Sequence, residues 1–351
     1  MTASRLQPLA ATMGEPAGIG GELVLKAWLA REERETPCFF VIDDPSRLER
    51  LAARLDWNVP IVSIEAPQSA ADLFSTALPV LAQHLPGSST PGHPDAANAT
   101  AVINSIREAT SLVMAGEASA VVTNPINKQV LYETGFVHPG HTEFLAELAG
   151  GALEPVMMLV CPGLRVIPVT VHLSLTDAIG ALSKSLIVTT VRTAAAALVR
   201  DFGIDRPRLA IAALNPHAGE GGFLGHEELD VIAPAVAELK AHGLSVSGPT
   251  PVDTLFHERA RQTYDAVICM YHDQALLPAK TIDFSNGVNV TLGLPFVRTS
   301  PDHGTAFDIA GTGVADETSF ISALTIATRI VEHRMANNRR SRQESTGTQR
   351  V

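Results

Sequence analysis

The sequence predicts an α/β protein of two domains, and three observations support this prediction. Short apolar runs of strand length alternate with longer segments whose apolar residues have helical spacing. The chain has 351 residues, which is long for one compact core and sufficient for two domains. Polar side chains directly follow several apolar runs, as in open α/β sheets, where ligands bind outside the carboxyl ends of the strands.

The composition excludes several classes of protein. Hydrophobic residues make up 46% of the chain and charged residues 18%, which is typical of a soluble enzyme. The formal charge of -11 argues against nucleic acid as a partner, because phosphate neutralisation needs clustered Lys and Arg. No apolar run reaches ~18 residues and residues 1–8 lack the apolar core of a signal peptide, so we expect no membrane association and a cytoplasmic location. Cys38, Cys161 and Cys269 lie far apart in apolar runs and are predicted to be reduced core residues.

The expected elements alternate along the chain. The apolar runs predict strands over 9–13, 38–42, 60–64, 118–123, 157–160, 165–171, 208–214, 264–270 and 288–292. Helical spacing predicts one helix that ends near residue 29 and others over 95–115, 182–202, 227–242 and 319–333. Residues 66–92 are rich in Pro and Ser and are expected to form a connector.

Three histidines follow predicted strands: His172, His217 and His272. A single histidine in such a place is more often a solvated or core residue than a ligand. If the three strands lie in one sheet, their carboxyl ends converge and the three imidazoles can reach one ion. A site of histidines with open coordination positions suits Zn, Co or Ni and leaves room for a substrate. Asp273 is then either a partner that orients a ligand or a base.

Further polar positions suggest an anion site. Lys280 and Arg298 lie next to the same strand ends and are the best candidate anion binders. The glycine-rich turn at 14–21 either holds a phosphate on helix N–H groups or is only a tight turn. At His141 and Thr142, a predicted helix start either binds an anion or is a simple N-cap beside a solvated histidine.

Five separated motifs together resemble the 4-hydroxythreonine-4-phosphate dehydrogenase family, which acts in vitamin B6 synthesis. They are Gly14-Glu-Pro-Ala-Gly-Ile-Gly, Gly140-His-Thr-Glu, Asn215-Pro-His-Ala-Gly-Glu-Gly-Gly, Tyr271-His-Asp-Gln and Gly293-Leu-Pro-Phe-Val-Arg-Thr-Ser. The resemblance extends over residues 9–330, and the main departure is Ala275, where the family usually has Gly after Gln. The loop His303-Gly-Thr-Ala-Phe-Asp-Ile-Ala-Gly is also similar to the adenosine-binding loop of isocitrate and isopropylmalate dehydrogenases.

The resemblance implies an isocitrate/isopropylmalate dehydrogenase-like fold, with two α/β/α domains around a cleft. The implied domains are a cofactor-side α/β domain of residues 1–133 and 285–335, and a second α/β domain of residues 134–284 that carries the metal ligands and the dimer contacts. The polar residues 336–351 are expected to form a disordered tail. The implied assembly is a homodimer, with the active site at the subunit interface and metal ligands from both chains.

The resemblance also implies the roles of individual residues. The ligands of a divalent metal, Zn, Mg or Co, are expected to be His172, His217 and His272. The substrate-binding residues are expected to be His141, Thr142, Lys280, Asn289 and Arg298. The residues that bind NAD or NADP are expected to be His303, Gly304, Thr305, Ala306 and Asp308. The candidate bases are Asp273 and Asp253.

The implied reaction is the NAD-dependent oxidation and decarboxylation of 4-phosphooxy-L-threonine to 3-amino-2-oxopropyl phosphate. Alternatives on the same fold are dehydrogenases of D-threonate or D-erythronate 4-phosphate, or of an aromatic cis-dihydrodiol. A phosphate acyltransferase is an alternative of another class, and it would need neither the histidines nor a nicotinamide. A metal-binding protein without catalysis would not need the loop at 303–308.

Overall fold

The computed structural model describes residues 6–138, 140–151 and 153–347. Helices and strands alternate along these residues, which confirms the α/β fold class. The chain divides into two compact units. Unit 1 comprises Met1–Leu153 and Leu294–Val331, and unit 2 comprises Glu154–Gly293 and Glu332–Val351. Each unit is therefore built from two separate stretches of the polypeptide.

The division differs from the expected domain boundaries at both junctions. Residues 134–153 were expected in the second domain but belong to unit 1, because α6 (His141–Leu148) buries Phe144 and Leu145 in the core of that unit. Residues 285–293 were expected in the cofactor-side domain but belong to unit 2. There, β11 (Val288–Leu292) pairs antiparallel with β6 (Val156–Cys161).

Unit 1 contains a parallel sheet whose central strands are buried. Its strands are β1 (Leu9–Thr12), β2 (Phe39–Asp43), β3 (Ile61–Ile64), β4 (Leu78–Ala82), β5 (Val121–Val122) and β12 (Arg298–Pro301). They lie in the order β3-β4-β2-β1-β5-β12 and pair in parallel. Every residue of β1 and β2 is buried, which explains why these strands read as continuous apolar runs. Strand β4 lies within 66–92, so the expectation of a connector without strands was wrong.

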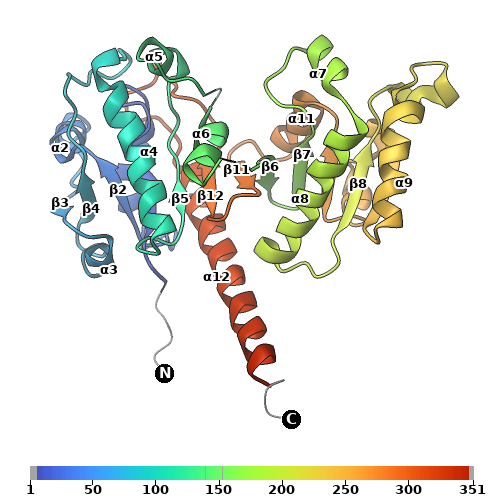
Figure 1. Ribbon diagram of the computed structural model, residues 1–351. Helices are drawn as coiled ribbons and strands as arrows, with labels where there is room; N and C mark the ends of the chain where they lie inside the picture. Colours follow the sequence, from blue (N-terminus) through green and yellow to red (C-terminus); the bar gives the residue numbers. More distant parts are fainter. Residues whose placement is uncertain (1–5, 139, 152, 348–351) are drawn as a thin grey trace. The chain divides into compact units, whose positions relative to one another are not determined.

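Helices cover the unit 1 sheet, and successive side chains of β2 face different helices. The helices are α1 (Gly20–Leu29), α2 (Pro45–Arg54), α3 (Ala70–Leu73), α4 (Ala99–Met114), α5 (Lys128–Glu133), α6 and the first half of α12 (Thr318–Gly347). The ring of Phe39 packs edge-on against Phe320 of α12, with centroids 5.9 Å apart. Phe40 points the other way and joins the buried cluster with Ile106 of α4, the helix that crosses the strands in Figure 1.

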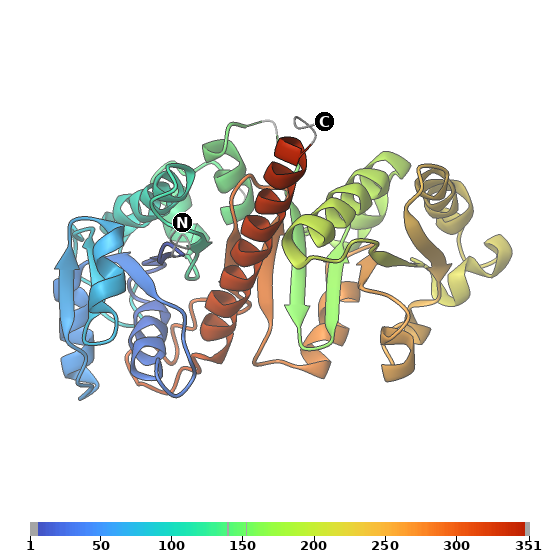
Figure 2. The same cartoon turned by 90° about the horizontal axis from the view of Figure 1, so that it is seen from below.

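The strands of unit 2 pair in mixed directions. Its strands are β6, β7 (Leu164–Pro168), β8 (Arg208–Ala212), β9 (Ser245–Thr250), β10 (Ala266–Cys269) and β11, in the order β11-β6-β7-β10-β8-β9. The antiparallel pair β6 and β7 confirms the predicted hairpin, and β7, β10, β8 and β9 pair in parallel. Its helices are α7 (Leu175–Ala181), α8 (Lys184–Phe202), α9 (Ala233–Ala241), α10 (Glu258–Arg261) and α11 (His272–Ile282). Figure 2 shows α8 on one side of these strands and α11 on the other.

The C-terminal segment is more ordered than its composition suggested. Helix α12 continues to Gly347, so the expectation of a disordered tail from residue 336 was wrong up to that residue, and residues 348–351 lie outside the described part. Within unit 2, Arg334 donates hydrogen bonds to both oxygens of the buried Asp201 carboxylate, and Asn337 Nδ2 donates to the carbonyl of Arg200. These contacts attach the polar part of α12, beyond its apolar first half, to α8 of unit 2.

The remaining whole-chain expectations concern membranes and cysteines. In the described ranges no single helix has the length and apolar character to cross a membrane, although α7 and α8, bent by 90° where they meet, pass that test when taken as a pair. Helix α8 packs eight of its residues, among them Ile187 and Leu198, into the unit 2 interior. All three cysteines are free thiols, as predicted.

Candidate active site

In unit 1, a buried arginine lies beside the end of β5. Arg298, the first residue of β12, has only 4% of its surface exposed. Its Nε and Nη2 donate hydrogen bonds to Thr123 Oγ1 at 3.2 and 2.6 Å, respectively. Burial lowers the pKa of Arg298 to about 10, and the nearby Glu143 carboxylate opposes this shift. The guanidinium therefore remains a cation at neutral pH in a place that water hardly reaches.

His141 lies next to this arginine, at the start of α6. Its Nε2 is buried and has no hydrogen-bond partner among the described residues, although the residue as a whole is partly exposed. Burial, with the positive charges of Arg298 and Lys128, holds the pKa of His141 well below its usual value. The ring is thus neutral at physiological pH, and its buried nitrogen can donate to or accept from a ligand.

The N-terminus of α6 carries no side-chain cap. The N-cap residue is Gly140, not Thr142, and within the described residues this end has no side-chain cap hydrogen bond. The expectation that Thr142 caps this helix was therefore wrong, whereas the expected helix start at these residues is confirmed. First-turn N–H groups without a cap, together with the positive end of the helix dipole, favour an anion.

Lys128 and Glu143, which lie beside the start of α6, were not among the predicted site residues. A Cβ added to Gly140 would lie 3.4 Å from both Lys128 Nζ and Glu143 Oε2, so both side chains extend over this glycine. Lys128 is the first residue of α5, which Asn127 caps through its side chain. The sequence carried a signal for Lys128, because it follows the polar residues at the end of β5. Its contact with the helix start at residue 141 depends on the fold of the intervening loop.

In unit 2, two of the three predicted metal ligands lie together. The rings of His172 and His272 have centroids 5.8 Å apart. His272 opens α11, directly after β10, and its Nδ1 lies 2.7 Å from Asp273 Oδ1. This contact fixes the ring and leaves Nε2 as the nitrogen that is available to a ligand. Asp273 is thereby placed as a residue that orients His272.

His217 lies in an unusual turn after β8. Residues 217–221 all have φ between 47° and 74°, the left-handed region, although three of them are not glycine. The buried Glu228 carboxylate accepts from the backbone N–H groups of Leu214 and Asn215 at 2.8 and 2.7 Å. A Cβ at Gly219 would lie 2.7 Å from Glu228 Oε2, so the turn requires glycine there. Glu228 thus holds the turn that presents His217.

The three histidines do not form a complete metal site within one chain. Within the described ranges, no group of three or more His, Cys, Asp or Glu side chains is close enough to hold a metal ion. The expectation that all three rings converge within one chain was therefore wrong for the described residues. His217 lies in the left-handed turn beyond its strand, whereas His272 follows β10. The involvement of a second chain stays a prediction.

The remaining candidates are distributed over both units. His141, Thr142 and Arg298 belong to unit 1, whereas Lys280 and Asn289 belong to unit 2. Lys280 lies on α11 with Nζ 5.5 Å from the centroid of Phe284, and Asn289 lies on β11 opposite Leu159. Asp253 is exposed in a short 3-10 turn, Val252–Thr254. The roles of these residues stay predictions.

The predicted cofactor loop is held against the glycine-rich turn after β1, within unit 1. The N–H of Ile19 donates to the carbonyl of Thr305 at 3.0 Å, and a Cβ at Gly18 would lie 2.9 Å from that oxygen. The buried Glu22 accepts hydrogen bonds from the N–H groups of Gly311 and Gly313. The turn at 14–21 therefore packs directly against residues 303–311, so it is more than a tight turn that reverses the chain.

The chain is similar to proteins of one family over most of its length. The family model described as pyridoxal phosphate biosynthetic protein PdxA matches residues 35–327. A 4-hydroxythreonine-4-phosphate dehydrogenase from Bradyrhizobium diazoefficiens is 54% identical over 335 residues, which cover 92% of this chain and 97% of the relative.

Solved structures agree with this similarity. The 4-hydroxythreonine-4-phosphate dehydrogenase from Klebsiella pneumoniae matches with a TM-score of 0.82 and 38% identity, covering 93% of this chain and 99% of that one. A terephthalate 1,2-cis-dihydrodiol dehydrogenase from Burkholderia xenovorans matches with a TM-score of 0.61 and 27% identity, covering 93% and 98%. The chain belongs to the PdxA family, the 4-hydroxythreonine-4-phosphate dehydrogenases.

Proposed function

We propose that the protein oxidises and decarboxylates 4-phosphooxy-L-threonine to 3-amino-2-oxopropyl phosphate, with NAD or NADP as oxidant and a divalent metal, in the synthesis of pyridoxal 5'-phosphate. The observation that carries this proposal is the cluster at the uncapped start of α6, where the buried cation of Arg298 lies with the partly buried Lys128 and the neutral ring of His141. A phosphorylated amino acid brings two anionic groups, and such a cluster is built to hold one of them.

Anion binding explains this cluster better than a purely structural role does. A buried cation costs free energy unless anionic groups compensate it, and the carboxylate that acts on Arg298 is Glu143. The buried Nε2 of His141 and the free first-turn N–H groups of α6 supply further donors. A phosphate or carboxylate oxygen placed here would use these donors together. We assign Arg298, His141 and Thr142 to substrate binding and add Lys128.

The histidines fit part of a metal site. His172 and His272 lie close together in one chain, Asp273 orients the second ring, and imidazole is a common ligand of Zn and Co. We propose that His172, His217 and His272 hold a divalent ion, and that two copies of the chain complete this set. A bound divalent ion would act as a Lewis acid that lowers the pKa of an alcohol. The protein is accordingly proposed to be a homodimer.

The residues then have separate tasks in the reaction. Arg298, His141 and Lys128 fix an anionic end of the substrate, and Lys280 and Asn289 are kept as further substrate-binding residues. Asp273 keeps His272 in one orientation. The proton of the oxidised hydroxyl goes to a carboxylate, for which Asp273 and Asp253 are the two candidates.

The loop at 303–308 is proposed to hold the dinucleotide, which accepts the hydride. The backbone of the β1–α1 turn approaches this loop closely, since a side chain at Gly18 would collide with Thr305. Asp308 is exposed and His303 is partly exposed on this loop. Both are therefore accessible to an adenosine group, while Glu22 holds the far end of the loop in place.

One assay tests this proposal. NADH or NADPH formation is followed with 4-phosphooxy-L-threonine, with D-threonate 4-phosphate and D-erythronate 4-phosphate, and with an aromatic cis-dihydrodiol, each with and without a chelator. We expect turnover of the amino acid phosphate that the chelator abolishes and an added divalent metal restores. Faster turnover of D-threonate 4-phosphate or D-erythronate 4-phosphate would reassign the substrate, and chelator-resistant turnover would refute the role of the metal.

A further inference from the structure

Helix α2 of unit 1 presents three arginines on one face. Arg47, Arg50 and Arg54 are spaced by three and four residues, which places them in line along the helix. Like charges at this spacing destabilise a helix, so their arrangement needs a compensating partner. Of the three, only Arg47 has an ion pair with a described residue: its Nη1 lies 2.5 Å from the carboxylate of the buried Asp43, the last residue of β2.

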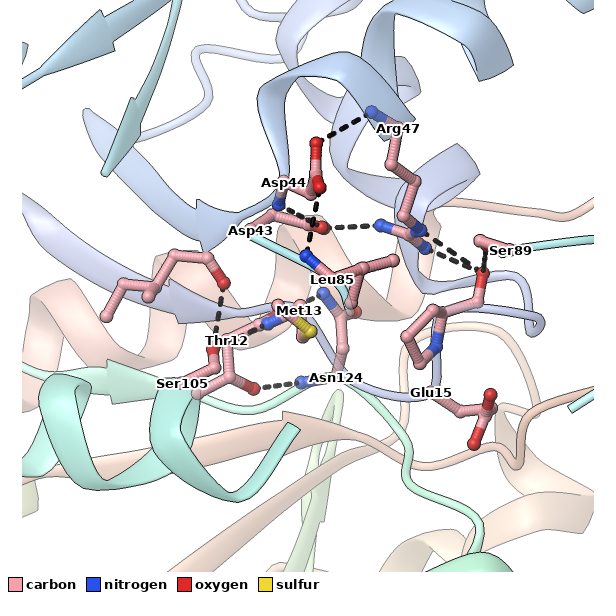
Figure 3. A network of polar contacts seen from close by, with 12 residues as sticks. Thr12, Met13, Glu15, Asp43, Asp44, Arg47, Leu85, Ser89, Ser105 and Asn124 are labelled. Carbon is pink, nitrogen blue, oxygen red and sulfur yellow. Dashed lines mark hydrogen bonds and ion pairs between the residues drawn. The ribbon is translucent and has the colours of Figure 1, made fainter. Parts of the chain in front are cut away.

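Arg47 is a fixed structural residue. Its Nε and Nη2 both donate to the carbonyl of Pro16, and Ser89 Oγ donates to the same oxygen at 2.9 Å. Figure 3 shows the Arg47 head group between Asp43 and Ser89. A Cβ at Gly21 would lie 3.0 Å from Arg47 Nη2, so α1 approaches this group closely. Arg47 therefore shapes the wall next to the β1–α1 turn, and each of its three guanidinium nitrogens already has a protein partner.

Arg50 and Arg54 have donors available. Both residues are exposed. The structure gives Arg50 no hydrogen bond or ion pair with a described residue, and gives Arg54 one hydrogen bond, from Nε to the carbonyl of Gly311 at 3.2 Å. This bond holds the Arg54 fork beside the end of the 303–311 loop and leaves its terminal amino groups open to a ligand.

The three arginines line one cavity. Its volume is about 360 Å³, within the range of about 300–1,000 Å³ that small-molecule sites occupy. Pro16, Gly18 and Gly311 contribute to its wall, and none of its described lining residues is an Asp or a Glu. The cavity thus combines free guanidinium donors with backbone from both the β1–α1 turn and the 303–311 loop.

We propose that this cavity binds a phosphate group of the adenine dinucleotide, with Arg50 and Arg54 as its donors. The inference rests on the proposed function for the identity of the ligand, since the loop at 303–308 is the proposed adenosine site. Guanidinium forks match phosphate oxygens in geometry and charge. Two groups of the dinucleotide carry such phosphate oxygens: the pyrophosphate, which NAD and NADP share, and the 2'-phosphate, which only NADP carries.

Direct binding measurements test this assignment. Dissociation constants for NAD and NADP are measured by calorimetry for the wild type, Arg50→Ala, Arg54→Ala and the double variant. Arg259→Ala is the matched control, because Arg259 is an exposed arginine on α10 in unit 2. Arg50→Lys, which keeps the charge but not the fork, is expected to bind with intermediate affinity.

We expect the double variant to bind at least one of the two dinucleotides at least about tenfold more weakly, with Arg259→Ala unchanged. Equal weakening of NAD and NADP identifies the pyrophosphate as the ligand, and weakening of NADP alone identifies the 2'-phosphate. Dissociation constants within twofold of the wild type for both dinucleotides would overturn the assignment. A wild type that neither binds nor reduces either dinucleotide would instead refute the proposed function.

Discussion

Removing Arg298 should separate substrate binding from folding at the cationic cluster. The planar fork of Arg298 can donate two parallel hydrogen bonds to one anionic group. Each charge-assisted bond contributes about 1.5–3 kcal/mol, so losing two raises the barrier by about 3–6 kcal/mol. At about 1.36 kcal/mol per tenfold, Arg298→Ala should lower kcat/KM for the phosphorylated substrate by about 10²- to 10⁴-fold.

The same variant should change a second property that a purely structural role would not change. The positive charge of Arg298 is, after burial, the second cause of the low pKa of His141. Its removal should therefore raise the pKa of His141, measured by NMR titration of the ring. Arg298→Lys is the control, since it keeps the charge and should lose less activity and shift the pKa less. A folded Arg298→Ala protein with kcat/KM within about threefold of the wild type and an unchanged His141 pKa would refute the reasoning.

Three further predictions concern the metal, the cofactor loop and pH. Asp273→Asn should weaken divalent-metal binding by about 10–100-fold, measured by competition with a chelating dye, because Asp273 orients His272; unchanged affinity would contradict that role. Glu22→Ala should lower the free energy of unfolding by about 3 kcal/mol, measured with urea, because the buried N–H of Gly311 and the partly buried N–H of Gly313 lose their acceptor. Glu22→Gln, which keeps one acceptor, should lower it less. The free energy of unfolding should fall as the pH drops below about 6.5, because His141 takes up a proton in the unfolded chain but not in the folded protein. His141→Gln should weaken this pH dependence. An unchanged pH profile in that variant would contradict the assignment to His141.

The sequence predicted most of the fold because burial and periodicity coincide in it. Strands β1 and β2 are buried throughout, and the two mostly apolar runs of β6 and β7 pair as the predicted antiparallel hairpin. Strand β4 was missed because Pro79 interrupts it within a segment rich in Pro and Ser, and only pairing with β2 and β3 makes it a strand. The extension of α12 was missed because its support comes from Asp201, far away in the sequence.

The candidate site was predictable where residues follow strands and less so where loops decide. His272 follows β10, as its position in the sequence suggested, whereas Arg298 opens β12 and was expected instead beside the strand end of His272. The contact of Lys128 with His141 and the left-handed turn of His217 depend on loop conformation, which apolar periodicity does not encode. Glu22 was missed because a carboxylate in the first turn of a helix is usually a solvated residue, whereas here it holds two backbone N–H groups.

Anomalous diffraction from crystals grown with cobalt tests the metal-assisted mechanism most directly. The predicted result is one strong peak at each site, about 2.0–2.1 Å from ring nitrogens of His172, His217 and His272, with the three side chains contributed by two copies of the chain. A fully active protein whose crystals show no metal peak beside these rings would contradict it.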